Sequence, residues 1–305
     1  MNKLIAIIGP TATGKTKLAI ELALHFNGEI INADSRQIYR YMDIGTAKPT
    51  KEELAAVPHH LVDIITPDKE FSLAEYQQLT GKTIQDIQER GKIPFLVGGS
   101  GLYVWTVLEG WVVPKVAPNA LFRRELEKKA GMGQGAELYE DLRQIDPAAA
   151  AKIDPRNIRR VIRAIEVNKF SKTPFSELQK KQTPPFQTLI IGLTADRQEL
   201  YRRADERADN MLKQGFVEEV SVLQKRGYSL SLPAMSGIGY REIGQYLNGE
   251  MTLDAAVYKI KTGTHRFIRH QYAWFRLKDE RIKWFDVEKA PELEINRTVA
   301  EFLKK

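Results

Sequence analysis

The chain alternates short apolar runs with stretches whose apolar residues recur at helical spacing. The apolar runs cover residues 3–9, 29–35, 92–101 and 188–194. Runs of this length predict buried parallel strands. After the first run, Leu18, Leu22 and Phe26 are spaced as on one face of a helix. Strands that alternate with helices predict an α/β fold, in which helices flank a parallel sheet.

Residues 72–91 begin with a capping-box sequence and end at a glycine, which predicts a helix. The last third of the chain, residues 196–305, is helical in pattern up to residue 281. Asp196, with Glu199 as its capping-box partner, likewise predicts a long helix that continues to about Gly227. Residues 281–287 predict an edge strand within the helical C-terminal part.

The alternation of strands and helices stops between Pro114 and Pro185. This segment has a helical pattern, is basic, and is bounded by proline-rich sequence. We therefore predict an inserted all-helical domain at residues 115–185. Residues 1–114 and 186–305 would together form a core of the phosphate-loop (P-loop) type with a helical C-terminal part.

The stretch "GPTATGKT", from Gly9 to Thr16, lies between the first predicted strand and the first predicted helix. This pattern in this context is typical of a phosphate-binding loop, in which backbone N–H groups and a helix N-terminus attract an anion. Lys15 would add a positive charge, and Thr16 can offer its hydroxyl to Mg²⁺. The alternative is a glycine-rich turn that matches the pattern by chance.

The usual ligand of such a loop is ATP, but the rest of the sequence does not favour an ATPase. The strand expected to end in a metal-binding Asp ends in glycines, at residues 98–99, and the sequence after Asp34 is not a metal-binding pattern. We predict that the loop binds a pyrophosphate group, which need not belong to a nucleotide. The residues assigned to it are Gly9, Pro10, Thr11, Ala12, Thr13, Gly14, Lys15 and Thr16.

The charge of the chain is concentrated in two stretches. The net charge is +7, and the excess of Lys and Arg lies in residues 152–181 and 259–283. A polyanionic partner explains such stretches better than a small substrate does. The chain has no Cys, which excludes disulfides and thiolate metal sites and fits a reducing cytosol. The apolar run at the N-terminus is too short for a signal peptide or a membrane span, so we expect a cytoplasmic protein without a membrane partner.

A set of motifs, in this order and spacing, resembles the bacterial tRNA dimethylallyltransferases, also called tRNA isopentenyltransferases. The likeness covers essentially the whole chain. The motifs are "GPTATGKT", "NADSRQIYRYMDIGTAKP" (32–49), "HHLVDI" (59–64), "VGGSGLY" (97–103), "RRADERADNML" (202–212), "GIGYRE" (237–242) and "RHQYAWFR" (269–276).

This resemblance implies transfer of a dimethylallyl group from dimethylallyl diphosphate to the exocyclic N6 amine of an adenosine beside the tRNA anticodon, with release of diphosphate. It implies a need for Mg²⁺, with Thr16 as the metal ligand of the protein. Asp34, Thr16 and Arg207 would be catalytic. Asp34 would accept a hydrogen of the amine, and Arg207 would bind the leaving diphosphate. Ser100 is expected to touch the diphosphate substrate.

The resemblance also implies contacts with the anticodon arm of tRNA. Arg36 and Gln37 would hold the displaced base or fill its place, and basic helices would contact phosphates. Where the family usually has Arg or Lys, this chain has His265 and His270, which puts those two contacts in doubt. The residues assigned to tRNA are Asp34, Ser35, Arg36, Gln37, Arg159, Arg160, Val161, Ile162, Arg163, Gly239, Tyr240, Arg241, Arg269, His270 and Gln271.

Each assignment has a structural alternative. Asp34 can cap the turn after its strand, Ser100 can belong to an ordinary tight turn, and Arg203 can pair with Glu199 instead of reaching a phosphate beside Arg207. The basic stretches can be amphipathic helices with a solvated face. For the whole protein, the alternatives are a nucleoside or nucleotide kinase, an enzyme that prenylates free adenine nucleotides, and a non-catalytic RNA-binding module. We expect a monomer.

Overall fold

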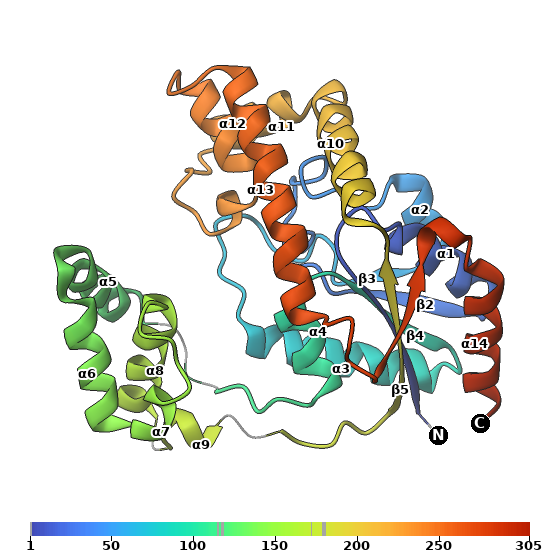
Figure 1. The fold of residues 1–305 in the computed structure, drawn as a ribbon, viewed down its shortest axis with the longest axis horizontal. Helices are drawn as coiled ribbons and strands as arrows, with labels where there is room; N and C mark the ends of the chain where they lie inside the picture. The colour runs from blue at the N-terminus through green and yellow to red at the C-terminus, as the bar shows by residue number, and fades with distance from the viewer. Residues whose placement is uncertain (1, 115, 117–118, 172, 179–180) are drawn as a thin grey trace. The chain divides into compact units, whose positions relative to one another are not determined.

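The computed structural model describes residues 2–114, 116, 119–171, 173–178 and 181–305. The chain forms two compact units (Figure 1). The first combines Met1–Leu108 with Pro184–Lys305, and the second is Glu109–Thr183. The insertion predicted at 115–185 corresponds to the second unit, and residue 115 lies outside the described residues.

A single six-stranded sheet is described in the first unit, and all its strand pairings are parallel. The order across the sheet is β3-β2-β4-β1-β5-β6. The register places Ile5 beside both Phe95 and Leu189. The predicted α/β fold is therefore confirmed, and the strand expected at 281–287 lies at one edge. The strands are β1 (Lys3–Ile8), β2 (Gly28–Asn32), β3 (His59–His60), β4 (Ile93–Gly98), β5 (Gln187–Thr194) and β6 (Ile282–Asp286).

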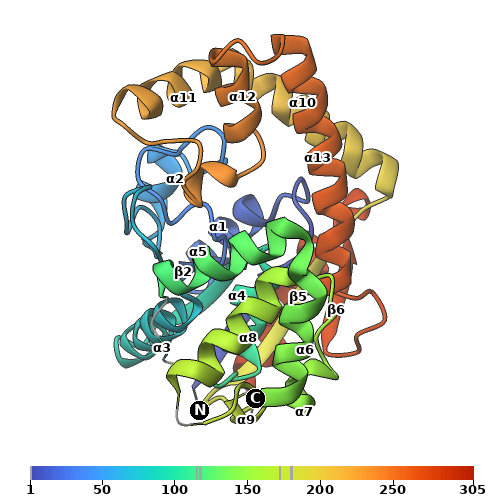
Figure 2. The ribbon, with the colours of Figure 1, turned by 90° about the vertical axis from the view of Figure 1, so that its left-hand side faces the viewer.

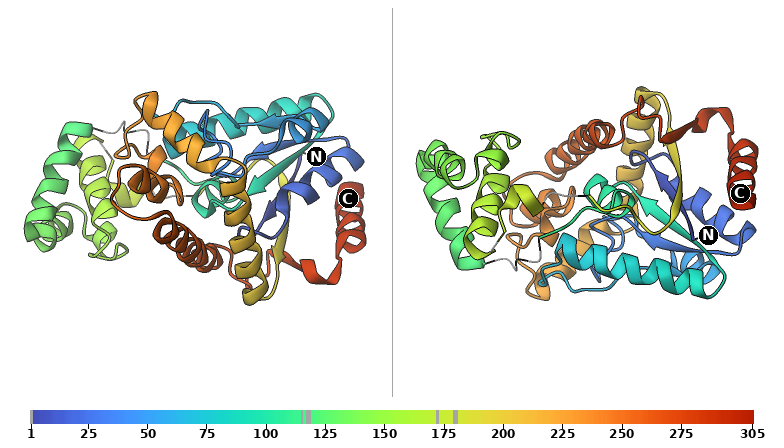
Figure 3. Two further views of the ribbon diagram at one scale, coloured as in Figure 1. Left: turned by 90° about the horizontal axis from the view of Figure 1, so that it is seen from above. Right: turned by 90° about the horizontal axis from the view of Figure 1, so that it is seen from below.

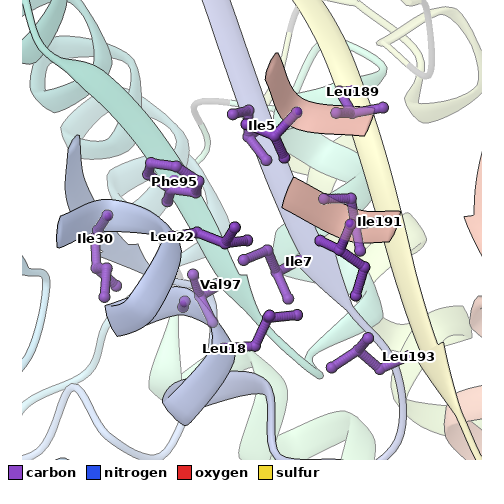
Figure 4. Packing of buried hydrophobic residues seen from close by; sticks show 14 of the residues in the cluster. Ile5, Ile7, Leu18, Leu22, Ile30, Phe95, Val97, Leu189, Ile191 and Leu193 are labelled. Atoms are coloured by element: carbon purple, nitrogen blue, oxygen red, sulfur yellow. The ribbon is translucent and has the colours of Figure 1, made fainter. Parts of the chain in front are cut away.

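Two helices cover one face of this sheet. They are α1 (Lys15–His25) and α14 (Glu292–Lys304), which lie next to each other in Figure 3. Leu22 of α1 and Ile295 of α14 belong to one buried cluster with Ile7 of β1, and Figure 4 shows Leu22 beside the strand residues. Burial of each large aliphatic side chain contributes roughly 1.5–3 kcal/mol. This packing fixes the position of α1, and with it the end of the phosphate loop.

The opposite face carries α3 (Leu73–Glu89) and α4 (Gly101–Leu108) (Figure 3). The capping box predicted for α3 is confirmed. Ser72 Oγ accepts the Glu75 N–H at 3.2 Å, and Glu75 Oε2 accepts the Ser72 N–H at 2.7 Å. A shorter helix, α2 (Lys51–Ala56), precedes β3 and was not predicted.

The C-terminal part of the first unit is helical, and α10 and α13 lie side by side (Figure 2). The prediction of a single helix from Asp196 to about Gly227 is wrong, because two helices occupy this segment. The chain breaks at Gly215, whose φ of 97° is left-handed and cannot continue a helix. Asp196 caps α10 without the expected partner, because Glu199 pairs with Arg203 at 2.6 Å. The helices are α10 (Arg197–Lys213), α11 (Phe216–Lys225), α12 (Tyr240–Leu247) and α13 (Leu253–Trp274).

The second unit is helical in its described part and has its own core. The core includes Val161 and Ile165 of α8. Glu166, on the same helix, is also buried, and Arg123 holds it with two hydrogen bonds of 2.9 and 2.7 Å. The elements are α5 (Ala120–Lys129), a π-helical turn (Ala130–Gln134), α6 (Gly135–Ile145), α7 (Pro147–Ala150), α8 (Ile158–Phe170) and α9 (Phe175–Leu178).

A buried carboxylate lies on β2, the strand that leads to Asp34. The side chain of Glu29 is 2% exposed and bonds Arg90, Lys92 and His60, at 2.8, 2.7 and 2.7 Å. Hydrogen bonds from Arg90 hold the pKa of the Glu29 carboxyl well below its usual range. Burial opposes this shift, and hydrogen bonds from Lys92 and His60 add to it. Glu29 thus joins β2 to its neighbours through charge.

We expect Glu29→Gln to lower the free energy of unfolding by about 2–4 kcal/mol near neutral pH, because the basic groups around it lose their anion. The pKa of Glu29 is lower in the folded than in the unfolded protein. The difference in free energy of unfolding between wild type and variant is therefore fully present above the unfolded pKa of about 4.3. It should shrink by about 1 kcal/mol as the pH falls to about 3.5. Urea denaturation of both proteins across this range measures the difference. A difference independent of pH would contradict the role of charge.

Candidate active site

The phosphate loop, Gly9–Thr16, joins β1 to α1 at the C-terminal edge of the sheet. Gly9, Ala12 and Gly14 have φ values of 139°, 68° and 80°, which produce its tight turns. Turns of this kind direct successive N–H groups to one side, where they bind anions. The hydroxyl of Thr16 makes no hydrogen bond within the described residues. That hydroxyl is therefore available to a metal ion or to an anion.

Lys15 lies over its own loop, and its Nζ donates a hydrogen bond of 2.6 Å to the carbonyl oxygen of Pro10. Burial and the charge of Arg207 lower the pKa of Lys15 to about 7, although Asp34 partly opposes the shift. An anion on the loop would favour the charged form of Lys15 and raise this pKa.

Arg207 extends from α10 to the same loop. Its Nη1 donates to Thr11 Oγ1 at 3.1 Å. Burial lowers the pKa of Arg207 and Asp34 opposes this, but a guanidinium stays charged at any ordinary pH. Arg203, four residues earlier, instead donates to Glu199 at 2.6 Å, so the ion-pair alternative is confirmed for it. Of these two arginines, Arg207 is the one at the loop.

Asp34 follows β2 in a turn that its own side chain stabilises. Asn32 Oδ1 accepts the Asp34 N–H at 2.9 Å, and Asp34 Oδ1 accepts the Arg36 N–H at 2.8 Å. The capping alternative is therefore confirmed for one carboxylate oxygen. The other, Oδ2, makes no hydrogen bond within the part of the chain that the structure describes. One acceptor thus remains for a ligand.

Ser100 belongs to the turn after β4, which packs against the turn after β2. Ser100 Oγ accepts the Ser35 N–H at 3.0 Å, and the Ser100 N–H donates to Ala33 O at 3.2 Å. A Cβ on Gly98 would lie 2.2 Å from Ala33 O, so this approach requires glycine. The hydroxyl of Ser100 therefore fixes Ser35 beside Asp34.

The polar ends of Arg36 and Gln37 bond backbone and side-chain groups of the first unit. Arg36 Nη1 donates to Pro233 O at 2.7 Å, and its Nη2 donates to Ser236 Oγ at 3.1 Å. Gln37 Nε2 donates to Ala47 O at 3.0 Å. We assigned both residues to tRNA from the sequence. Here they fix the loops around Asp34, and both residues also line the cavity described below.

These residues line a cavity of about 610 Å³ within the first unit. Its polar lining includes Thr11, Lys15, Thr16, Asp34, Ser35, Arg36, Gln37, Ser100, Arg207 and Gln271. Its apolar lining includes Val97, Ala204, Ala208, Met211, Phe216, Ile238, Ile260 and Phe267. The cavity thus combines groups for an anion with a surface for a hydrocarbon. The sequence did not reveal the apolar lining, because apolar spacing on a helix does not distinguish a cavity wall from a core.

Glu219 organises one side of this site and was not predicted. Its Oε2 accepts the N–H groups of Asp43 and Ile44, at 2.8 and 2.7 Å. Its Oε1 accepts the hydroxyl of Tyr240 at 2.7 Å. Tyr240 is buried, and its hydroxyl is used in this hydrogen bond. The sequence instead predicted that Tyr240 contacts tRNA. No local motif marks Glu219, because its partners are distant in the sequence.

The second unit exposes only part of the predicted tRNA-binding segment. Val161 and Ile162 are 0% and 2% exposed, which corrects their assignment, because core side chains cannot contact RNA. Arg163 donates to the buried Glu166 on the same helix at 2.6 Å and is committed there. Arg159 and Arg160 are exposed.

The polar face of α13 also combines a residue that is bonded inside the protein with residues that lie on the surface. His265 Nε2 lies 2.8 Å from Asp205 Oδ1, and its ring stacks on Tyr201 with centroids 4.0 Å apart. Arg269 is exposed but donates to the Tyr201 hydroxyl at 2.8 Å. His270 is exposed. His265 therefore joins α13 to α10, while Arg269 and His270 remain on the surface.

Gln271 is 3% exposed, and its amide bonds the Thr11 N–H and Gly99 O. This corrects its assignment to tRNA, because both ends of the amide are used inside the protein.

Of the "GIGYRE" motif, Gly239 is buried and Arg241 is exposed.

The described residues contain no group of three or more His, Cys, Asp or Glu that could hold a metal ion. One oxygen donor for a hard cation is nevertheless present at the loop, the Thr16 hydroxyl, which makes no hydrogen bond within the described residues. A Mg²⁺ ion there would have to take most of its ligands from water and from a bound phosphate.

Comparison with known proteins identifies the family. A family model described as IPP transferase matches residues 37–278. A tRNA dimethylallyltransferase of Roseiflexus sp. (strain RS-1) is 54% identical over 276 residues, which cover 90% of each chain. The chain belongs to the IPP transferase family.

Two solved structures of relatives share this fold. The full-length tRNA isopentenylpyrophosphate transferase from Bacillus halodurans is 41% identical, with 100% of this chain and 97% of that chain covered and a TM-score of 0.74. A eukaryotic dimethylallyltransferase acting on tRNA is 30% identical, with 94% and 74% covered and a TM-score of 0.80. The IPP transferase fold thus extends over both units of the chain.

We expect pyrophosphate binding to take up a proton at Lys15. At about pH 8 a lysine whose pKa is about 7 is mostly neutral, and the anion favours its charged form, so binding should take up nearly one extra proton. The affinity should fall as the pH rises above 7. Calorimetry in buffers of different ionisation enthalpy measures the uptake, with Lys15→Arg as the control, since arginine stays charged. Equal uptake by the two proteins would contradict a neutral Lys15.

Proposed function

We propose that this protein transfers a dimethylallyl group from dimethylallyl diphosphate to the N6 amine of the adenosine adjacent to the tRNA anticodon, releasing diphosphate. The observation that carries the proposal is one cavity that combines the phosphate loop, Arg207 and a free oxygen of Asp34 with an apolar lining. The names of the relatives support the same reaction.

In this proposal the phosphate loop and Arg207 bind the donor. The N6 nitrogen forms a bond to the dimethylallyl carbon as the bond from that carbon to the diphosphate oxygen breaks. Negative charge then grows on the leaving diphosphate, where Lys15 and Arg207 stabilise it. We further propose that the Thr16 hydroxyl and the diphosphate oxygens hold Mg²⁺, which when bound would neutralise part of this charge.

Asp34 serves the acceptor. The N6 amine of adenine is a weak nucleophile, because its lone pair is delocalised into the ring. Asp34 Oδ2 can accept an N6 hydrogen, which orients the amine and provides a place for the proton that is lost. The Asp34 N–H donates to Asn32 Oδ1, which fixes the backbone, and Asp34 Oδ1 accepts the Arg36 N–H, which orients the carboxylate. No phosphoryl group is transferred.

The exposed basic residues are proposed to contact tRNA phosphates. They are Arg159 and Arg160 in the second unit and Arg269 and His270 on α13. No helix in the described residues is long and apolar enough to cross a membrane. Because the proposed substrate is tRNA, we also propose a cytoplasmic location, and we propose that the protein acts as a monomer.

The transfer assay tests the proposal directly. The protein is incubated with unmodified tRNA, labelled dimethylallyl diphosphate and Mg²⁺, and the label should enter the RNA at an adenosine next to the anticodon. A parallel reaction with labelled ATP tests the kinase alternative. ADP formed with a nucleoside or nucleotide acceptor, and no label in RNA, would overturn the proposal.

We expect Asp34→Asn to lower kcat by about 100-fold or more, because a general base typically contributes a factor of this size. Affinity for tRNA should stay within a few-fold, since the carboxylate touches one atom of a large interface. Asp86→Asn, which alters an exposed carboxylate of α3, is the matched control. Single-turnover kinetics and filter binding measure the two effects. A kcat near that of the wild type would exclude the general-base role.

Replacing both Arg159 and Arg160 with Gln should make tRNA binding less sensitive to salt. The slope of log K against log salt should flatten by about one to two units, roughly one per lost phosphate contact. The control is the double variant Arg143→Gln/Arg156→Gln, because those exposed arginines pair with carboxylates in the same unit. Unchanged slopes in the first variant would show that α8 does not contact the tRNA backbone.

A further inference from the structure

Gln271 links three segments that are far apart in the sequence. Its Oε1 accepts the N–H of Thr11 at 2.9 Å, and its Nε2 donates to Gly99 O at 3.1 Å. The amide is buried, so water does not compete for these bonds. One side chain of α13 therefore connects the phosphate loop to the turn after β4.

The same residue of the loop also receives Arg207. Arg207 Nη1 donates to Thr11 Oγ1 at 3.1 Å, so Thr11 is held by Gln271 through its backbone and by Arg207 through its hydroxyl. The next residue, Ala12, has a φ of 68°, which residues with a Cβ seldom adopt. A conformation of this kind persists only where its surroundings fix it.

We propose that Gln271 is a positioning residue for the donor site. By fixing Thr11 it sets the turn of the phosphate loop at Ala12 and the point at which the Arg207 guanidinium is held. It touches no reacting atom and acts through Thr11. The two bonds need one acceptor and one donor on the same side chain, which Gln provides and Glu or Met does not. This inference rests on the proposed function of the same site.

The first test is Gln271→Met, which keeps the length of the side chain and removes both bonds. We expect the KM for dimethylallyl diphosphate to rise and kcat to fall, each by roughly 10-fold. This is the size of effect expected when buried donors and acceptors lose their hydrogen bonds. Pyrophosphate affinity should fall by a similar factor, and tRNA affinity should stay within about twofold. The matched control is Gln88→Met on α3, which loses a bond of 3.0 Å to Lys3 O away from the cavity.

The second test disturbs the same contact from its other side. A Cβ on Gly99 would lie 2.2 Å from Gln271 Nε2, so Gly99→Ala must displace the amide. We expect its effect on KM and kcat to resemble that of Gln271→Met. In a Gln271→Ala background the amide is gone and the next contact of the new Cβ is Gly9 O at 3.3 Å, so Gly99→Ala should add less than it does in the wild type, and the double-mutant cycle should be non-additive. This arm decides the question even where Gln271→Met does not fold.

Two results would overturn the inference. One is a pyrophosphate affinity in Gln271→Met equal to that of Gln88→Met, and the other is additive losses in the cycle. Pyrophosphate binding requires no transfer to tRNA, so it separates this inference from the proposed function. Lost pyrophosphate affinity in a protein that transfers no label would leave the positioning role intact and overturn the proposed reaction alone.

Discussion

Two partly buried cations and a carboxylate meet at the C-terminal edge of one parallel sheet, and the site is arranged around their charges. Burial and the neighbouring Arg207 lower the pKa of Lys15 to about 7, and Asp34 only partly offsets them. Like charges in a partly buried site repel more strongly than they do in bulk water. A diphosphate on the loop would relieve this repulsion, so the charges of the site favour an anion before any chemistry occurs.

The parallel sheet explains why these groups meet. The loop follows β1, Asp34 follows β2 and Ser100 follows β4, and in parallel sheets the C-terminal ends of the strands lie at one edge. The helices then complete the site, with Arg207 on α10 and Gln271 on α13. The donor site therefore depends on how α10 and α13 pack over the sheet, which a Lys261–Asp209 pair of 2.7 Å and the His265–Asp205 pair stabilise.

The parts of the site that the sequence predicted are those encoded by local patterns. A strand, a glycine-rich loop and a helix in succession identify the phosphate loop, and a short strand delivers Asp34. The helix predicted to run through Gly215 failed because its apolar spacing continues across the break. A glycine inside such a pattern is compatible with either one helix or two.

Polar residues on helices were harder to place from sequence. Spacing shows that Gln271 and His265 lie on α13, but not whether another helix or a loop covers that face. Both are used inside the protein, and so is Arg163 in the second unit. Glu219 was missed for the same reason, since its role depends on contacts with backbone far away in the sequence.

The most direct test of this account is a crystal structure of the protein with pyrophosphate and Mg²⁺. In that structure Lys15 Nζ should leave Pro10 O and, with Arg207, bond phosphate oxygens on the loop, while the Thr16 hydroxyl contacts the metal. Pyrophosphate bound away from the loop, with Lys15 still on Pro10 O, would contradict it.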